Sequence, residues 1–83
     1  MERVLVEVYL PAASKSFDIY IPLSSKISEV LLLVSKVISE LSDGTFLAAE
    51  DTVLCDAVSG NILNINMSVY ESGIKNGAKL ILI

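Results

Sequence analysis

Residues 27–41 have the periodicity of one amphipathic helix, and this segment constrains the fold more than any other. At 100° per residue, its apolar side chains fall within an arc of about 120°, the width of a helix face that packs on a core. The apolar members of this face are Ile27, Val30, Leu31, Val34, Val37, Ile38 and Leu41. We expect Ser24 or Ser25 to cap a helix that begins near Lys26, and residues 42–44 (Ser-Asp-Gly) to end it.

Two segments with the alternation of a β-strand precede the helix. Residues 4–10 place Leu5, Glu7 and Tyr9 on one face and only apolar side chains on the other, and residues 17–21 alternate in the same way. The Pro-Ala-Ala-Ser stretch between the segments favours a turn, so the two strands should pair as an antiparallel hairpin. Since proline has no N–H for a sheet ladder, Pro22 should end the second strand.

A third strand is expected at residues 52–58. Because an unpaired carboxylate is costly to bury, we expect Asp56 to point away from the core. This facing places Val53, Cys55 and Ala57 inside, and Leu54 and Val58 outside.

The C-terminal part of the sequence predicts short elements. Residues 59–61 (Ser-Gly-Asn) should turn into a short partner strand around Ile62 and Leu63. Residues 69–73 are typical of a tight turn or a single helical turn, and Asn76-Gly77 is a further turn signal. Residues 80–83 should close the chain as a last strand, with Leu82 in the core.

The size and composition of the chain exclude several classes of function. With 83 residues, the chain has room for one domain, residues 1–83. Its formal net charge of -4 and its scattered basic residues argue against nucleic-acid binding. No histidine is present and Cys55 is the only cysteine, so His-based catalysis, most zinc sites and disulfides are excluded. We therefore expect a protein with no cofactor and no enzymatic activity.

The sequence also predicts a cytoplasmic protein that does not insert into membranes. Its longest unbroken apolar run, residues 30–34, is far shorter than the roughly 20 residues of a membrane span. The first residues include Glu2, Arg3 and Glu7 where a secretory signal has an apolar segment.

The predicted order is a hairpin, one long helix, a shorter hairpin, a turn and a final strand. This order resembles the ubiquitin-like β-grasp fold, an α+β fold in which one helix crosses a mixed sheet of four to five strands and the last strand lies parallel beside the first. The resemblance rests on PLSSKISEV at residues 22–30 and on VYESGIKNGAKLILI at residues 69–83. The second stretch is similar to the part of ubiquitin where a tight turn precedes the final strand.

Within this superfamily, the chain is most similar to the EsaB/YukD family of small ubiquitin-like proteins encoded with type VII (WXG100) secretion systems of Gram-positive bacteria. The similarity lies in the length, in the irregular segment after the helix, and in the Gly-Ile-x-Asn-Gly pattern at residues 73–77. It implies an accessory or regulatory component of the secretion machinery that acts through contacts with other subunits. It implies no active-site residues.

Two other functions remain open. Ubiquitin and the sulfur carriers act through a flexible tail that ends in Gly-Gly, whereas this sequence ends in Leu-Ile-Leu-Ile83, so a modifier or sulfur-carrier role is disfavoured unless the native chain extends further. A ubiquitin-like adaptor domain of another pathway would have a very similar sequence.

The outer face of the predicted sheet is the candidate interaction surface. Its apolar members are Leu5, Tyr9, Tyr20, Leu54, Val58, Ile81 and Ile83. We expect this face to bind a protein, either a second copy of the chain or a secretion subunit. The alternative is that these side chains only stabilise strands, since ordinary protein surfaces are more than half apolar.

Three further features have mainly structural interpretations. Leu32 lies in the polar arc of the helix, where an exposed leucine is usually uninformative but can belong to a second contact surface. Cys55 has no basic neighbour to lower its pKa and is expected to be an inert buried thiol. Glu50 and Asp51 are expected to be solvated charges, because adjacent strand residues point to opposite faces.

Overall fold

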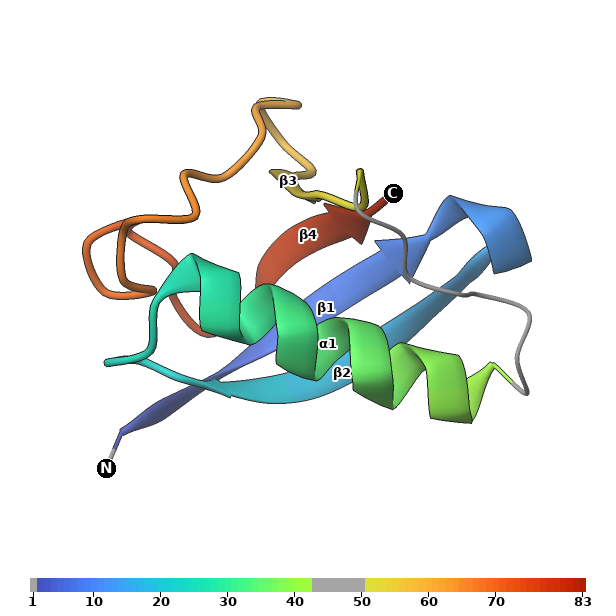
Figure 1. The fold of residues 1–83 in the computed structure, drawn as a ribbon, viewed down its shortest axis with the longest axis horizontal. Coiled ribbons are helices and arrows are strands. Elements are labelled where there is room, and N and C mark those ends of the chain that lie inside the picture. Colours follow the sequence, from blue (N-terminus) through green and yellow to red (C-terminus); the bar gives the residue numbers. More distant parts are fainter. Residues whose placement is uncertain (1, 43–50) are drawn as a thin grey trace.

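The computed structural model describes residues 2–42 and 51–83, which form one helix and a mixed sheet. The strands are β1 (Arg3–Leu10), β2 (Lys15–Pro22), β3 (Leu54–Asp56) and β4 (Ala78–Leu82), and the helix is α1 (Ile27–Leu41). A short 3-10 helix, η1 (Pro11–Ala13), connects β1 to β2. The helix lies across one face of the sheet (Figure 1).

The strand order in the sheet is β2-β1-β4-β3. β1 pairs antiparallel with β2 and parallel with β4, and β3 pairs antiparallel with β4. The predicted hairpin and the predicted parallel pairing of the first and last strands are therefore confirmed. The described residues contain four strands, and residue Ile62 adds a single bridge to Cys55 where a partner strand was expected.

One continuous apolar core lies between the helix and the sheet. It contains the alternate residues of β1 and the predicted face of α1, because strand side chains alternate with period 2 while helix side chains return after 3 to 4 residues. Its buried members from these elements are Val4, Val6, Val8, Leu10, Ile19, Ile21, Ile27, Val30, Val34, Ile38, Leu54, Leu80 and Leu82.

The side of α1 that faces the core was predicted correctly except at the last residue of the helix. Leu41 is 58% exposed because it is the last helical residue, one turn beyond Ile38, the last residue of α1 in the core. Leu32 is 74% exposed, as its place in the polar arc predicts.

The predicted serine cap of α1 is wrong. The residue at the cap position is Lys26, whose N–H donates to Glu29 Oε1 at 3.0 Å. The next two helical N–H groups donate to carbonyls of residues 65–67: Ile27 N–H to Met67 O at 2.8 Å and Ser28 N–H to Ile65 O at 3.1 Å. A distant stretch of backbone therefore supplies the acceptors that a serine hydroxyl supplies in other helices.

The third strand is shorter than predicted and has the opposite facing. Leu54 is 2% exposed and lies opposite Leu82, so both side chains belong to the core. The prediction failed because Asp56 is the last residue of β3, where its carboxylate stays in contact with solvent although Leu54 on the same face is buried. The carboxylate accepts hydrogen bonds from Val58 N–H and Ser59 Oγ in the following turn. Ala57, predicted to point inward, is exposed, and Val53 is only half-buried.

The predicted turns at the C-terminal side are confirmed. Gly60 and Gly77 have φ angles of 77° and 86°, a conformation that glycine adopts without the strain of a side chain. The turn at residues 59–61 is closed by Asp56 N–H donating to Asn61 O at 2.9 Å. At the end of the described chain, Ile83 exchanges two backbone hydrogen bonds with Val53, at 2.6 and 3.0 Å.

Candidate protein-interaction surface

The face of the sheet that lies away from the helix is built by the second set of alternate residues. On β1 these are Leu5, Glu7 and Tyr9, which are half-buried or exposed while their neighbours are buried. The register places Tyr20, Asp18 and Ser16 of β2 opposite them. On the other side of β1, Lys79 lies opposite Glu7, and Ile81 lies opposite Tyr9.

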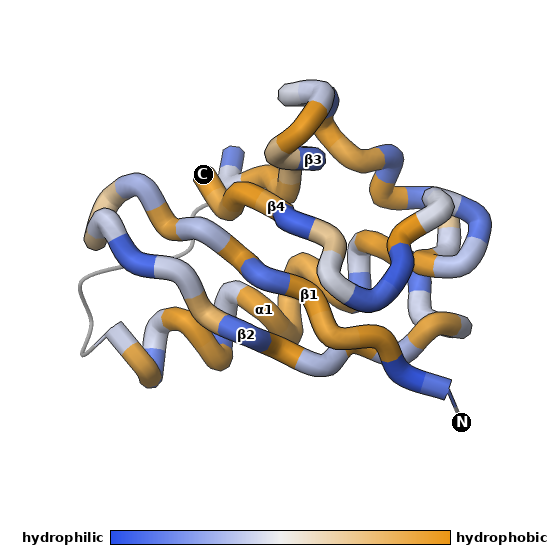
Figure 2. The backbone as a smooth tube through the Cα atoms, turned by 180° about the vertical axis from the view of Figure 1, so that it is seen from behind, coloured by the Kyte–Doolittle hydropathy of each residue, from blue (hydrophilic) through white to orange (hydrophobic). Residues whose placement is uncertain are grey.

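A row of charged residues crosses the middle of this face. Asp18 is the partner of Glu7 in the antiparallel pairing, and Lys79 is its partner in the parallel pairing. Figure 2 shows the result as adjacent hydrophilic segments in β2, β1 and β4. The charged row therefore divides the apolar surface predicted from the sequence into two ends.

The first apolar end consists of Leu5 and Tyr20, which are directly opposite each other. Arg3 lies beside them, with its guanidinium carbon 5.1 Å from the centroid of the Tyr20 ring. This distance is within the range of a cation–π contact. Tyrosine and arginine are enriched among the residues that dominate binding energy at protein interfaces.

The second apolar end consists of Tyr9, Ile81 and Cys55, which are neighbours across three strands. Cys55 was predicted to face the core, but it shares the face of Ile81 and is nevertheless only 5% exposed. Ile83, which is exposed, continues this end along the line of β4.

Two of the residues predicted for this face, Leu54 and Val58, do not lie on it, and Leu32 lies outside it on the helix, as predicted. Leu54 is in the core, so its predicted exposure is wrong. Val58 is 88% exposed but lies in the turn after β3, beyond the paired strands. Leu32 is exposed on the helix, which covers the opposite face of the sheet.

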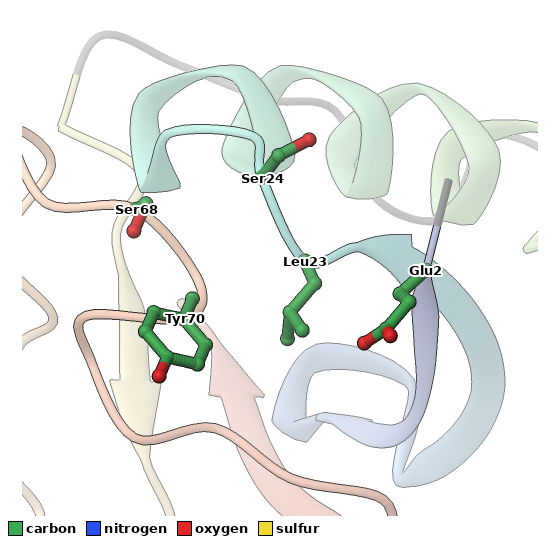
Figure 3. A pocket seen from close by; sticks show the side chains of 5 residues that line it. All are labelled: Glu2, Leu23, Ser24, Ser68 and Tyr70. Atoms are coloured by element: carbon green, nitrogen blue, oxygen red, sulfur yellow. The ribbon is translucent and has the colours of Figure 1, made fainter.

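Sequence reasoning missed a set of exposed apolar residues in the segment that connects β3 to β4. They are Ile62, Ile65 and Tyr70. Ile62 belongs to the short partner strand expected from the sequence, and residues 64–70 show no periodicity from which the exposure of Ile65 and Tyr70 could be predicted. Tyr70 and Leu23 together line a shallow depression of about 510 Å³, with Glu2, Ser24 and Ser68 at its margin (Figure 3).

Among the residues that the structure describes, two carboxylates have a clearly shifted pKa. The pKa of Asp56 is lowered, first by the hydrogen bond from the Ser59 hydroxyl and then by the Val58 amide. The pKa of Glu71 is lowered by hydrogen bonds from the Ser68 amide and hydroxyl. Both carboxylates hold turns together and neither lies in the charged row.

The described residues contain no group of three or more His, Cys, Asp or Glu side chains placed to hold a metal ion. Within the same residues, no helix has the length and apolar character needed to cross a membrane.

No protein-family model matches the chain. No curated protein is a significant match to its sequence. Similar solved structures are nevertheless numerous at the level of the fold.

Two similar structures are domains of type VII secretion proteins. The EccD5 ubiquitin-like domain of Mycobacterium xenopi has a TM-score of 0.70 and 20% identity, over 100% of this chain and 94% of that one. The ubiquitin-like domain of EccD1 of Mycobacterium tuberculosis has a TM-score of 0.69 and 15% identity, over 100% and 99% of the two chains. A third similar structure, a chain of the toluene 4-monooxygenase HD complex, has a TM-score of 0.77 and 13% identity, over 98% and 96%.

These similarities and the observed topology define a ubiquitin-like β-grasp fold of the α+β class, as the sequence predicts. At these levels of identity they establish the fold and leave the subfamily open.

Proposed function

We propose that this chain is a non-enzymatic accessory or regulatory component of a bacterial type VII secretion system, acting in the cytoplasm through protein–protein contacts. The observation that carries the proposal is the similarity to the EccD1 and EccD5 ubiquitin-like domains, which covers the whole of this chain and nearly all of those domains. The sequence resemblance to the EsaB/YukD family supports the same role independently.

The outer face of the sheet is the surface that we assign to these contacts. Its two apolar ends offer Tyr20 with Arg3 and Tyr9 with Ile81, residue types that bind well at interfaces. The charged row between them gives such a contact a defined register, because a partner must match the order Lys79, Glu7, Asp18 across the strands.

The experiment is co-purification of the secretion machinery with wild-type protein and with two matched variants, each carrying one new carboxylate. Ile81→Asp introduces the charge into the second apolar end, whereas Leu32→Asp introduces it on the exposed side of the helix. We expect wild type and Leu32→Asp to retain secretion subunits and folded Ile81→Asp to lose them. Retention of every partner by folded Ile81→Asp would count against the assigned surface.

A role as an adaptor domain in an unrelated pathway is the second candidate. The similarity to a chain of the toluene 4-monooxygenase complex favours it, because the same fold occurs there in another multiprotein assembly. Partners from such a pathway in the co-purification, with no secretion subunit among them, would decide for this candidate. A modifier role predicts a mass adduct after incubation with an activating enzyme and ATP, and we expect none.

A further inference from the structure

The two edges of the sheet differ greatly in length. β3 forms one edge with three residues, whereas β2 forms the other with eight. Within residues 2–42 and 51–83, no strand lies beyond β2. A long edge strand presents unpaired N–H and C=O groups that another chain can bind.

The hydrogen bonds of Leu5 fix the direction in which the β1 backbone groups point. Leu5 N–H donates to Asn76 Oδ1 and Leu5 O accepts from Gly77 N–H, each at 2.8 Å. Both Leu5 groups therefore point toward the β4 side. Because successive residues of a strand point their backbone groups to alternate edges, those of Val4 and Val6 point toward β2.

The register then identifies the free groups of β2. Ile21, Ile19 and Phe17 are the partners of Val4, Val6 and Val8, so their backbone groups bond to β1. The backbone groups of the residues between them, Ser16, Asp18 and Tyr20, must point away from β1 to the open edge.

The charge at the centre of this edge is unbalanced. From β4 to β2, the charged row consists of Lys79, Glu7 and Asp18. It therefore contains two carboxylates and one ammonium group, and the carboxylate of Asp18 stands at the edge of the sheet. Like charges directly opposite each other on adjacent strands are destabilising. A cation in the next position of the row, beyond Asp18, would relieve that repulsion.

A second copy of this chain does not suit the edge. Antiparallel pairing of two β2 strands satisfies the groups of Ser16, Asp18 and Tyr20 together only when Asp18 lies opposite Asp18. That register sets two carboxylates against each other, which is one of the ways in which proteins prevent edge strands from pairing with themselves.

We propose that the β2 edge binds an extended segment of a partner protein that carries Lys or Arg opposite Asp18. The segment adds a strand beside β2, held by backbone hydrogen bonds to Ser16, Asp18 and Tyr20. The residue opposite Tyr20 is apolar or aromatic, because Tyr20 is 57% exposed and its ring offers a cross-strand contact. This proposal rests on the proposed function as a protein-binding module and specifies the chemistry of one partner.

The test is a selection of peptides from a random library displayed on phage, with the folded domain as bait. Enriched peptides are expected to carry Lys or Arg two residues away from an apolar or aromatic residue, so that both side chains lie on the same face of the added strand, opposite Asp18 and Tyr20. On binding, the amides of Ser16, Asp18 and Tyr20 become protected from hydrogen exchange in NMR spectra. Failure to enrich any peptide, or protection of amides elsewhere instead, overturns the proposal.

Two variants at Asp18 sharpen the test with the best selected peptide. Asp18→Lys should weaken its binding by about fivefold or more and should favour the same peptide with its basic residue replaced by Glu. Asp18→Pro removes one N–H group from the open edge of β2 but breaks no hydrogen bond to β1, so the variant should keep the circular dichroism spectrum of wild type. It should bind neither the selected peptide nor the version with Glu. If Asp18→Pro does not fold, the charge exchange in Asp18→Lys decides alone, and unchanged affinity there overturns the proposal.

The Ile81→Asp variant separates this proposal from the proposed function. Its substitution lies two strands from the β2 edge, so it should bind the selected peptide as wild type does. Normal peptide binding by a variant that has lost the secretion subunits leaves this proposal intact. If wild type selects no peptide and Asp18→Lys still co-purifies with the secretion subunits, the edge proposal is refuted while the proposed function stands.

Discussion

Residues 3–41 and residues 56–77 are stabilised in different ways. In the first region, β1, β2 and α1 bury apolar side chains at regular intervals against one another. In the second region only Val69 and Ile74 are buried, and most of the side-chain hydrogen bonds of the described residues are found there. The contrast teaches that burial sets the architecture, while short polar side chains fix the path of the connection between β3 and β4.

The largest effect is expected in the first region, from Val34→Asp. Val34 is completely buried in the middle of α1, so the variant places an unpaired carboxylate in the core. The cost of such a group is about 4 kcal/mol or more, which approaches the total stability of a small domain. We expect the variant to be unfolded, as measured by circular dichroism and by the loss of dispersed NMR signals.

The matched control for this variant is Leu32→Asp in the same helix. Leu32 is exposed, so its replacement should shift the melting temperature little. Equal destabilisation by the two substitutions would contradict the helix phase and with it the account of the first region.

An intermediate effect is expected in the second region, from Asn76→Ala. The Asn76 side chain accepts a hydrogen bond from Leu5 N–H. This bond holds the turn before β4 against β1. Loss of one such hydrogen bond costs about 1 kcal/mol, which lowers the melting temperature of a domain of this size by about 4 to 8 °C. Asn76→Asp retains an acceptor oxygen and should melt close to wild type. An alanine variant as stable as wild type would show that the side chain is dispensable.

The same contrast explains which parts of the fold could be predicted from the sequence. The strands of the first hairpin and the helix were predicted because regular periodicities run through residues 4–10, 17–21 and 27–41 and report directly on which side is buried. The cap of α1 was not predicted. Its first N–H groups donate to the backbone carbonyls of Met67 and Ile65, and nothing in the sequence near the helix encodes that contact.

The candidate surface was predictable only in part, for a related reason. Alternation gave the facing of Leu5, Tyr9 and Ile81, but the alignment of Asp18 with Glu7 and Lys79 depends on the strand register, which the sequence alone did not supply. The facing predicted for β3 was wrong because Asp56 was used to assign it, whereas Asp56 ends the strand and keeps its carboxylate in an exposed turn whichever way the strand faces.

The smallest effect concerns the turn carboxylates of the second region, Asp56 and Glu71. Hydrogen bonds from Ser59 and Ser68 lower their pKa values in the folded state below the ordinary values of 3.8 and 4.5. A group whose pKa is lower in the folded state stabilises the fold above its unfolded pKa and loses that contribution as the pH falls through the folded value. The domain should therefore lose stability on acidification below about pH 4.5.

Urea denaturation between neutral and acidic pH measures this loss, with the double variant Asp56→Asn, Glu71→Gln as the control. The amides keep an acceptor oxygen for each serine but do not titrate, so the stability of the double variant should fall less steeply with pH than that of wild type. Because both carboxylates lie in turns that are open to solvent, the difference should be small beside the effect of Asn76→Ala. Parallel pH profiles for the two proteins would mean that the turns hold without their charges, and would assign the acid sensitivity of the domain to its other carboxylates.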